Sequence, residues 1–237
     1  MPDYWEERMK ELFKGKQYSY EIIREAVIMY CSTPLSYREC EKFMARYLIK
    51  VNHTTIYRWV QEYGKVIYAL WKKKNGLSNS WRMDETYVKI KGKNHYLYRA
   101  VDSTGKNLDM WLLKKRDTQA AKAFFKRLVR QYGAPRALVT DKYVATLKAI
   151  KELQEEMILP KDLDHRTAKV LNNILEQDHR LVKKRLPKSC GLQTMRTGKA
   201  TLQGIEVLHA LDKQSRSDEN RSDHFLWNQF DELLQVS

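Results

Sequence analysis

The pattern of hydrophobic and polar positions predicts three helices in the first part of the chain. Apolar residues recur there every three to four positions, as they do along one face of a helix. Ser36, followed by Glu39 three residues later, is typical of a capping box at the start of the second helix. The third helix is expected to have Thr54 or Thr55 as its N-cap and to end at Gly64. The three segments are 20–31, 36–46 and 53–64.

Three short helices of this kind resemble a helix-turn-helix, in which the last helix enters the major groove of DNA. The apolar stripe of the third helix would pack inward and leave its polar residues outside. A plain three-helix bundle with a solvated outer face remains the alternative. The candidate DNA-contacting residues of the third helix are Thr54, Thr55, Tyr57, Arg58 and Gln61.

The pattern changes after a segment of lysines and small polar residues. Alternating apolar and polar positions then predict strands separated by short turns, and later helices separate two short apolar strands. Asp117 is expected to cap the first of these helices and Gly133 to end it. The strands are 81–92, 94–105, 107–115, 135–141 and 163–166, and the helices are 117–133, 146–157 and the helix that contains Glu176.

This order, β-β-β-α-β-α-β-α, predicts an α/β fold: a ribonuclease-H-like mixed sheet with flanking helices, preceded by an all-α helix-turn-helix domain. The segments also give a domain plan for the whole chain. The plan comprises an N-terminal extension helix (1–18), a helix-turn-helix domain (19–70), a linker (71–80), a catalytic domain (81–186), and a basic segment with C-terminal helices (187–237).

Composition narrows the choice of partner. The chain of 237 residues has 44 lysines and arginines against 29 acids, a net charge of +15. A surface so basic favours a polyanion, and nucleic acid is the first candidate. Because no apolar run is long enough to cross a bilayer and no signal peptide is apparent, we expect a protein without a membrane partner. Three scattered cysteines fit a reducing cytoplasm and argue against structural zinc.

Three acids occupy informative places in the predicted order. Asp84 lies in the first strand, Asp141 ends the fourth, and Glu176 lies in the helix after the fifth. Neighbouring first and fourth strands would bring the two aspartates together, and the late helix could add Glu176. Such carboxylates need a cation, and hard oxygen ligands suit Mg²⁺, for which Mn²⁺ can substitute. Two such ions are a standard device for attack at a phosphodiester.

Other acids are expected to be ordinary. Alternation along the strand points Glu85 to the face opposite Asp84, so Glu85 should be solvated or paired. Turns or helix caps would explain Asp102, Asp109 and Asp117. Asp141 could also be a helix N-cap, and Glu176 could pair with a nearby arginine, so that the residues alone leave the metal site open.

The segment LNNILEQDHRLVKKR, residues 171–185, combines Glu176 with basic residues. Helical spacing places Glu176 on one face with polar and cationic neighbours. We therefore expect Glu176 to face a metal while its neighbours contact DNA phosphates. The candidate DNA-binding residues here are Lys169, Asn172, Arg180, Lys183, Lys184 and Arg185.

Long stretches of the chain resemble the DDE transposases of bacterial insertion-sequence family six. WRMDETYVKIKGKNHYLYRAVDSTG, VTDK and LNNILEQDHRLVKKR are similar to the catalytic core of that family, and HTTIYRWVQEYGK is similar to its helix-turn-helix. The 34 residues between Asp141 and Glu176 match the spacing of the family, and Lys183 is the basic residue seven after the glutamate. The sequence departs from the family at Leu48, where glycine is common, and at Tyr143, where alanine is usual.

The resemblance implies catalytic roles for Asp84, Asp141, Glu176 and Lys183, the first three as metal ligands. It implies a transposase that binds terminal inverted repeats, cleaves the 3′ ends of its element and transfers them to target DNA, typically forming cointegrates. Such enzymes act on double-stranded DNA as homodimers or larger homo-oligomers. A cytoplasmic, nucleoid-associated bacterial location would follow.

Two other functions remain open from the sequence. A non-catalytic helix-turn-helix protein derived from a transposase would carry the same charge. A ribonuclease acting on RNA–DNA hybrids would use the same acids but would give the N-terminal helices no role.

Overall fold

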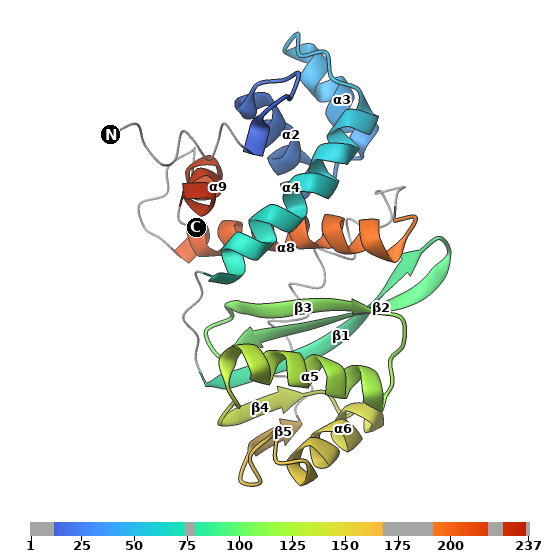
Figure 1. Cartoon of the computed structure of the whole chain (residues 1–237), viewed down its shortest axis with the longest axis vertical. Coiled ribbons are helices and arrows are strands. Elements are labelled where there is room, and N and C mark those ends of the chain that lie inside the picture. The colour runs from blue at the N-terminus through green and yellow to red at the C-terminus, as the bar shows by residue number, and fades with distance from the viewer. Residues whose placement is uncertain (1–11, 74–78, 168–191, 218–224, 236–237) are drawn as a thin grey trace. The chain divides into compact units, whose positions relative to one another are not determined.

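The computed structural model describes residues 12–73, 79–167, 192–217 and 225–235. Within these ranges the chain forms two compact units. One unit is helical and contains segments from both ends of the chain, and the other is built on a β-sheet (Figure 1). Each unit is described by itself.

The helical unit combines the three predicted N-terminal helices with two helices from the C-terminal part of the chain. The three N-terminal helices are present, and the second begins with the expected capping box. The backbone N–H of Glu39 donates to Ser36 Oγ at 3.2 Å, and the N–H of Ser36 donates to Glu39 Oε2 at 2.7 Å. The helices are α2 (Tyr20–Ser32), α3 (Tyr37–Arg46), α4 (His53–Lys73), α8 (Met195–Ser217) and α9 (Phe225–Gln235).

The start of α4 differs from the prediction. The helix begins at His53, and the side chain of Asn52 caps it by accepting from the N–H of Thr54 at 2.9 Å. Thr54 and Thr55 are therefore inside the helix and are not its N-cap. Leu48, in the turn that precedes α4, has a φ of 61°, a conformation that glycine adopts more easily than leucine.

The predicted end of α4 was also wrong. The helix continues beyond Gly64 to Lys73, so residues 71–73 are helical although they were assigned to a linker. Gly64 is buried where α4 meets α8, and a Cβ atom added there would lie 2.5 Å from the carbonyl oxygen of Ala200. The glycine thus permits close packing of two helices and does not end one.

The C-terminal helices pack on the N-terminal ones, whereas the sequence had suggested a separate segment 187–237. In α9, Asp231 accepts from Arg24 of α2 at 2.5 Å and also from the hydroxyl of Tyr20. Phe13 stacks on Tyr63 of α4, with ring centroids 4.8 Å apart. These contacts tie segments from both ends of the chain into one helical core.

The second unit contains a mixed five-stranded sheet of order β3-β2-β1-β4-β5. The first three strands are antiparallel neighbours, whereas β4 runs parallel to both β1 and β5. This is the predicted ribonuclease-H-like arrangement, including the neighbouring first and fourth strands. The strands are β1 (Ser80–Ile90), β2 (Lys93–Asp102), β3 (Asn107–Leu113), β4 (Ala137–Thr140) and β5 (Asp164–Thr167).

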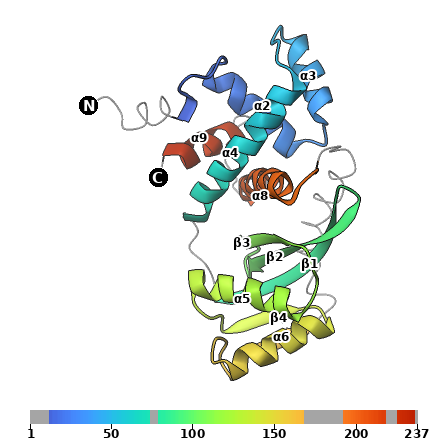
Figure 2. The same cartoon turned by 45° about the vertical axis from the view of Figure 1, so that its right-hand side comes forward.

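Two helices, α5 (Thr118–Tyr132) and α6 (Val144–Glu155), cover one face of the sheet (Figures 1 and 2). Their apolar residues join strand residues such as Trp81 and Met83 in one buried cluster. Asp117 caps α5 by accepting from the N–H of Ala120 at 2.9 Å, and Gly133 ends it with a φ of 77°, both as predicted. Asp117 therefore fixes where α5 starts.

Among the other acids expected to lie in turns, Asp102 and Asp109 behave differently. Asp102 accepts from the N–H groups of Thr104 and Lys106, as a turn residue does. Asp109 is instead a buried β3 residue whose carboxylate pairs with Arg127 of α5 at 2.7 Å. Its role is to join the sheet to the helix layer.

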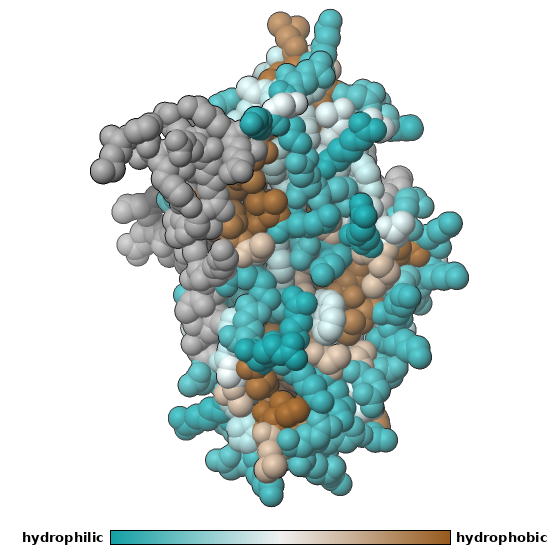
Figure 3. All heavy atoms as spheres, in the orientation of Figure 1, coloured by the Kyte–Doolittle hydropathy of each residue, from teal (hydrophilic) through white to brown (hydrophobic). Residues whose placement is uncertain are grey.

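The face shown in Figure 3 is mostly hydrophilic, with small hydrophobic areas between the polar ones. Within the described part of the chain, no helix has the length and apolarity needed to cross a membrane.

Candidate active site

The pairing of β1 with β4 explains how two acids distant in sequence approach one another. Arg82 of β1 is the parallel partner of Val139 of β4. Asp84 follows Arg82 by two residues and is still within β1, and Asp141 follows Val139 by two residues and comes directly after β4. Functional groups gather where neighbouring parallel strands stop pairing at their carboxyl side, and Asp84 lies just past the part of β1 that pairs with β4. The sequence therefore predicted this meeting of strands correctly.

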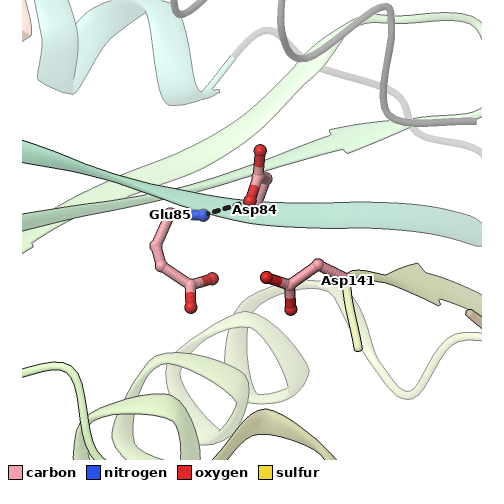
Figure 4. Close-up of side chains that lie close together, drawn as sticks. All are labelled: Asp84, Glu85 and Asp141. Atoms are coloured by element: carbon pink, nitrogen blue, oxygen red, sulfur yellow. Dashed lines mark hydrogen bonds between the residues drawn. The ribbon is translucent and has the colours of Figure 1, made fainter. Parts of the chain in front are cut away.

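The structure adds a third acid that the sequence had set aside. Asp84, Glu85 and Asp141 each offer a carboxylate oxygen, and these three atoms lie within 4.8 Å of one another. Figure 4 shows the carboxylates of Glu85 and Asp141 pointing toward each other, while the Asp84 carboxylate accepts from the backbone N–H of Glu85. Alternation along β1 starts the side chains of Asp84 and Glu85 in opposite directions. It does not keep a carboxylate oxygen of Glu85 away from those of Asp84 and Asp141.

Arg116, in the loop before α5, pairs with two of these acids. Its Nε donates to Glu85 Oε1 at 2.6 Å, and its Nη2 donates to Asp141 Oδ2 at 3.1 Å. The sequence predicted that Glu85 is either solvated or paired. The structure confirms the second alternative, because the Glu85 side chain pairs with Arg116 and is only 1% exposed. Burial raises the pKa of Glu85 to about 7, and the Arg116 guanidinium opposes that rise.

The residues present fit a divalent cation. Carboxylate oxygens are the ligands that Mg²⁺ and Mn²⁺ prefer, and a cluster of three repels itself unless positive charge is near. In addition, Glu85 Oε2 is buried and has no hydrogen-bond partner among the residues that the structure describes. Such an atom gains from a cation, because a buried polar atom without a partner is costly. The arrangement can thus hold a cation at the end of β4, beside the middle of β1.

Comparison with known proteins agrees with this geometry. Residues 78–215 match a family model described as a DDE domain. The transposase for insertion sequence-like element IS431mec of Staphylococcus aureus (strain N315) is 44% identical over 205 residues, which cover 86% of this chain and 90% of that protein. The transposase for insertion sequence element IS257 in transposon Tn4003, also of Staphylococcus aureus, matches to the same extent.

The chain belongs to the DDE transposases of insertion-sequence family six. Solved structures similar to this transposase include the HTLV-2 integrase catalytic core domain in complex with magnesium (TM-score 0.42, 20% identity, 56% of this chain and 87% of that one). The catalytic domain of Mos1 mariner transposase is also similar (TM-score 0.38, 14% identity, 79% of this chain and 92% of that one).

Several predicted site residues of the transposase lie outside the described residues. Glu176 and Lys183 are among them, so the meeting of Glu176 with the two aspartates stays a prediction. The DNA-binding candidates Lys169, Asn172, Arg180, Lys184 and Arg185 lie in the same undescribed range, 168–191.

The candidates on α4 are placed in two different ways. Thr54 and Arg58 are exposed, while Thr55 and Tyr57 are half-buried. Gln61 differs from the expectation, since its amide donates to the hydroxyl of Thr201 in α8 at 2.6 Å. Its side chain thus joins two helices, and this contact argues against a role for Gln61 in reading DNA.

Arg116 and Tyr143 are site residues that sequence reasoning missed. The Arg116 guanidinium lies over the Tyr143 ring, with Cζ 3.8 Å from the ring centroid. The acidic partners of Arg116 are distant in sequence: Asp141 is 25 residues away and Glu85 is 31 residues away. One sequence signal could have pointed to Arg116: it directly precedes Asp117, the cap of α5. Because α5 covers the strands that carry the acids, a residue at the start of α5 can reach the site.

Proposed function

We propose that this transposase cuts the 3′ ends of its element and joins them to target DNA at a site built from Asp84, Asp141 and Glu176. The approach of Asp84, within β1, and Asp141, just past the end of the neighbouring strand β4, carries the proposal, because both belong to a DDE domain. The 34 residues between Asp141 and Glu176 support the third ligand. Mg²⁺ is the expected ion, with Mn²⁺ as a substitute.

Each part of the chain would have its own task. The aspartates would hold the divalent ions, which supply the positive charge and Lewis acidity that phosphodiester chemistry requires. Before an ion binds, Arg116 would keep Asp141 and Glu85 oriented toward each other. The exposed Thr54 and Arg58 of α4 would read the terminal inverted repeats, and Lys183 would contact phosphates near the reacting bond.

The assembly around the DNA is part of the same proposal. We infer that the transposase acts as a homodimer or larger homo-oligomer, since two ends of one element must be cut and joined together. Its products would be cointegrates, and it would act in the nucleoid of a bacterial cell.

The test separates catalysis from DNA binding. Asp84→Ala should abolish cleavage of a labelled terminal-repeat duplex in Mg²⁺ and leave binding of that duplex within about twofold, because Asp84 serves the metal and not the repeat. Gel-based cleavage and fluorescence anisotropy on one protein preparation measure the two effects. The control is Asp162→Ala, which removes an exposed acid from a loop outside the site.

Cleavage by Asp84→Ala at the wild-type rate would refute the metal role of Asp84. A wild-type protein that binds the repeat but never cuts it, with either ion, would instead favour the non-catalytic DNA-binding protein.

A further inference from the structure

One arginine joins the two acids that come from different strands. Arg116 donates to Glu85 of β1 at 2.6 Å and to Asp141, just past β4, at 3.1 Å. The two contacts differ in their surroundings. The Glu85 side chain is 1% exposed, whereas the Asp141 side chain is 32% exposed. Since water competes more strongly for an exposed ion pair, the contact with Asp141 is the easier one to break.

Tyr143 holds Arg116 in this position. The guanidinium carbon lies 3.8 Å from the centroid of the Tyr143 ring, a distance at which the cation is attracted to the ring face. The Tyr143 hydroxyl donates to the Arg116 carbonyl oxygen at 3.0 Å, and the Tyr143 N–H donates to Asp141 Oδ1 at 3.0 Å. Tyr143 thus contacts both partners of the weaker ion pair, Arg116 and Asp141.

The negative charges of the three acids explain what the positive charge of Arg116 does at this site. Carboxylates that lie within 4.8 Å of one another repel, and the repulsion is strongest when no divalent cation is bound. Arg116 places one positive charge between Glu85 and Asp141. A divalent ion bound to Asp141 would lie near that charge and would compete with it for the same carboxylate oxygens.

We propose that Arg116 is a positioning residue that occupies Asp141 before a divalent ion binds, and that it then releases Asp141 while it keeps Glu85. This inference rests on the proposed metal site. The inference predicts two effects of Arg116. Arg116 stabilises the metal-free protein, and it lowers the affinity of the carboxylates for a divalent ion below the affinity that they would have without it.

The direct test is a titration of the whole protein with Mn²⁺, followed by the EPR signal of the free ion. Arg116→Gln should bind Mn²⁺ about tenfold more tightly than wild type. This factor is at the low end of the shift that one neighbouring opposite charge causes in the protonation equilibrium of a carboxylate. Its melting temperature in EDTA should be lower than that of wild type, and its rise on addition of Mn²⁺ should be larger. The control Lys115→Gln removes the same charge from an exposed neighbouring position and should match wild type.

Two further variants refine the test. Arg116→Lys keeps the charge and should bind Mn²⁺ nearly as wild type does. Tyr143→Ala keeps Arg116 but removes the ring and hydroxyl that hold it, so it should bind Mn²⁺ more tightly than wild type by a smaller factor than Arg116→Gln. Tyr143→Ala also provides the answer if Arg116→Gln does not fold.

The Mn²⁺ affinity decides the matter, because a purely structural arginine would lower the melting temperature in EDTA without tightening metal binding. Unchanged or weaker Mn²⁺ binding by Arg116→Gln, or by Tyr143→Ala when the first variant does not fold, would overturn the inference and leave the proposed function standing. Failure of the wild-type protein to bind Mn²⁺ at all, with and without terminal-repeat DNA, would overturn both.

Discussion

His165 lies beside the acidic site, on the strand that neighbours β4. Its Nε2 is 2.9 Å from the hydroxyl of Thr140, the residue before Asp141. Partial burial lowers the pKa of His165 below its usual value of 6.5. The unfolded chain therefore takes up a proton at this residue more readily than the folded protein. Stability contributed by neutral His165 is present above pH 6.5 and is lost as the pH falls below it.

We therefore expect the melting temperature of the wild-type protein to fall more than that of His165→Gln when the pH is lowered from about 7.5 to about 5.5. Differential scanning fluorimetry without divalent ions measures both. His95→Gln, which removes a histidine near the β1–β2 turn, should follow the wild type. Parallel curves for wild type and His165→Gln would exclude His165 as the source of the pH dependence.

At the same scale, sequence reasoning found the residues that the topology brings together but not their partners. The strand order was enough to place Asp84 near Asp141. The direction of an individual carboxylate depends on contacts over long sequence distances, and so the approach of Glu85 to Asp141 was missed. For the same reason, a helical wheel could not reveal that Gln61 bonds to Thr201 of α8, which lies 140 residues further along the chain.

At the scale of elements, two glycines set how closely two helices approach. Gly64 of α4 and Gly204 of α8 face one another, and a Cβ atom built on Gly64 would lie 3.4 Å from the backbone nitrogen of Gly204. A Cβ atom built on Gly204 would lie 2.9 Å from Cys31 Sγ of α2. The three helices thus pack through small groups, and this contact joins the N-terminal and C-terminal segments of the helical unit.

Gly64→Ala tests that packing against helix propensity. Alanine would favour the α4 helix by roughly 1 kcal/mol. Its Cβ would however lie 2.5 Å from the Ala200 carbonyl oxygen, and overpacking of this kind costs about 1–3 kcal/mol. We expect a net loss of up to about 2 kcal/mol in the free energy of unfolding, measured by urea denaturation. Lys65→Ala, on the exposed side of α4, should change it by less than about 0.5 kcal/mol. A gain in stability on Gly64→Ala would show that the carbonyl group of Ala200 in α8 does not clash with a side chain at position 64.

Periodicity predicted which elements exist far better than where they end. The five strands and the helices α5 and α6 of the sheet unit were found because alternation and helical spacing are local signals, and Asp117 and Gly133 marked the bounds of α5 correctly. The predicted helix that contains Glu176 lies outside the described residues. Gly64 was misread because a glycine that ends a helix and a glycine that packs against another helix look the same in sequence. Only the position of α8 separates the two meanings.

At the scale of the whole molecule, a helical unit and an acidic site on a sheet unit are parts of a chain with a net charge of +15. The acids of the proposed metal site lower the charge only locally. Basic residues are frequent elsewhere, including exposed ones such as Arg58 of α4. Because DNA releases condensed counterions when cationic side chains neutralise its phosphates, much of the affinity should come from salt-sensitive contacts that do not depend on base sequence.

This view makes a quantitative prediction about salt. If the transposase neutralises about 6–10 phosphates, its affinity for a terminal-repeat duplex should fall by roughly 10³–10⁵ between about 50 and 200 mM salt. Fluorescence anisotropy at several salt concentrations gives the slope directly. A random duplex of equal length should show a slope at least as steep but lower affinity at every salt concentration, because base contacts add affinity that salt affects little. A flat response on both duplexes would mean that the positive charge of the chain serves a partner other than DNA.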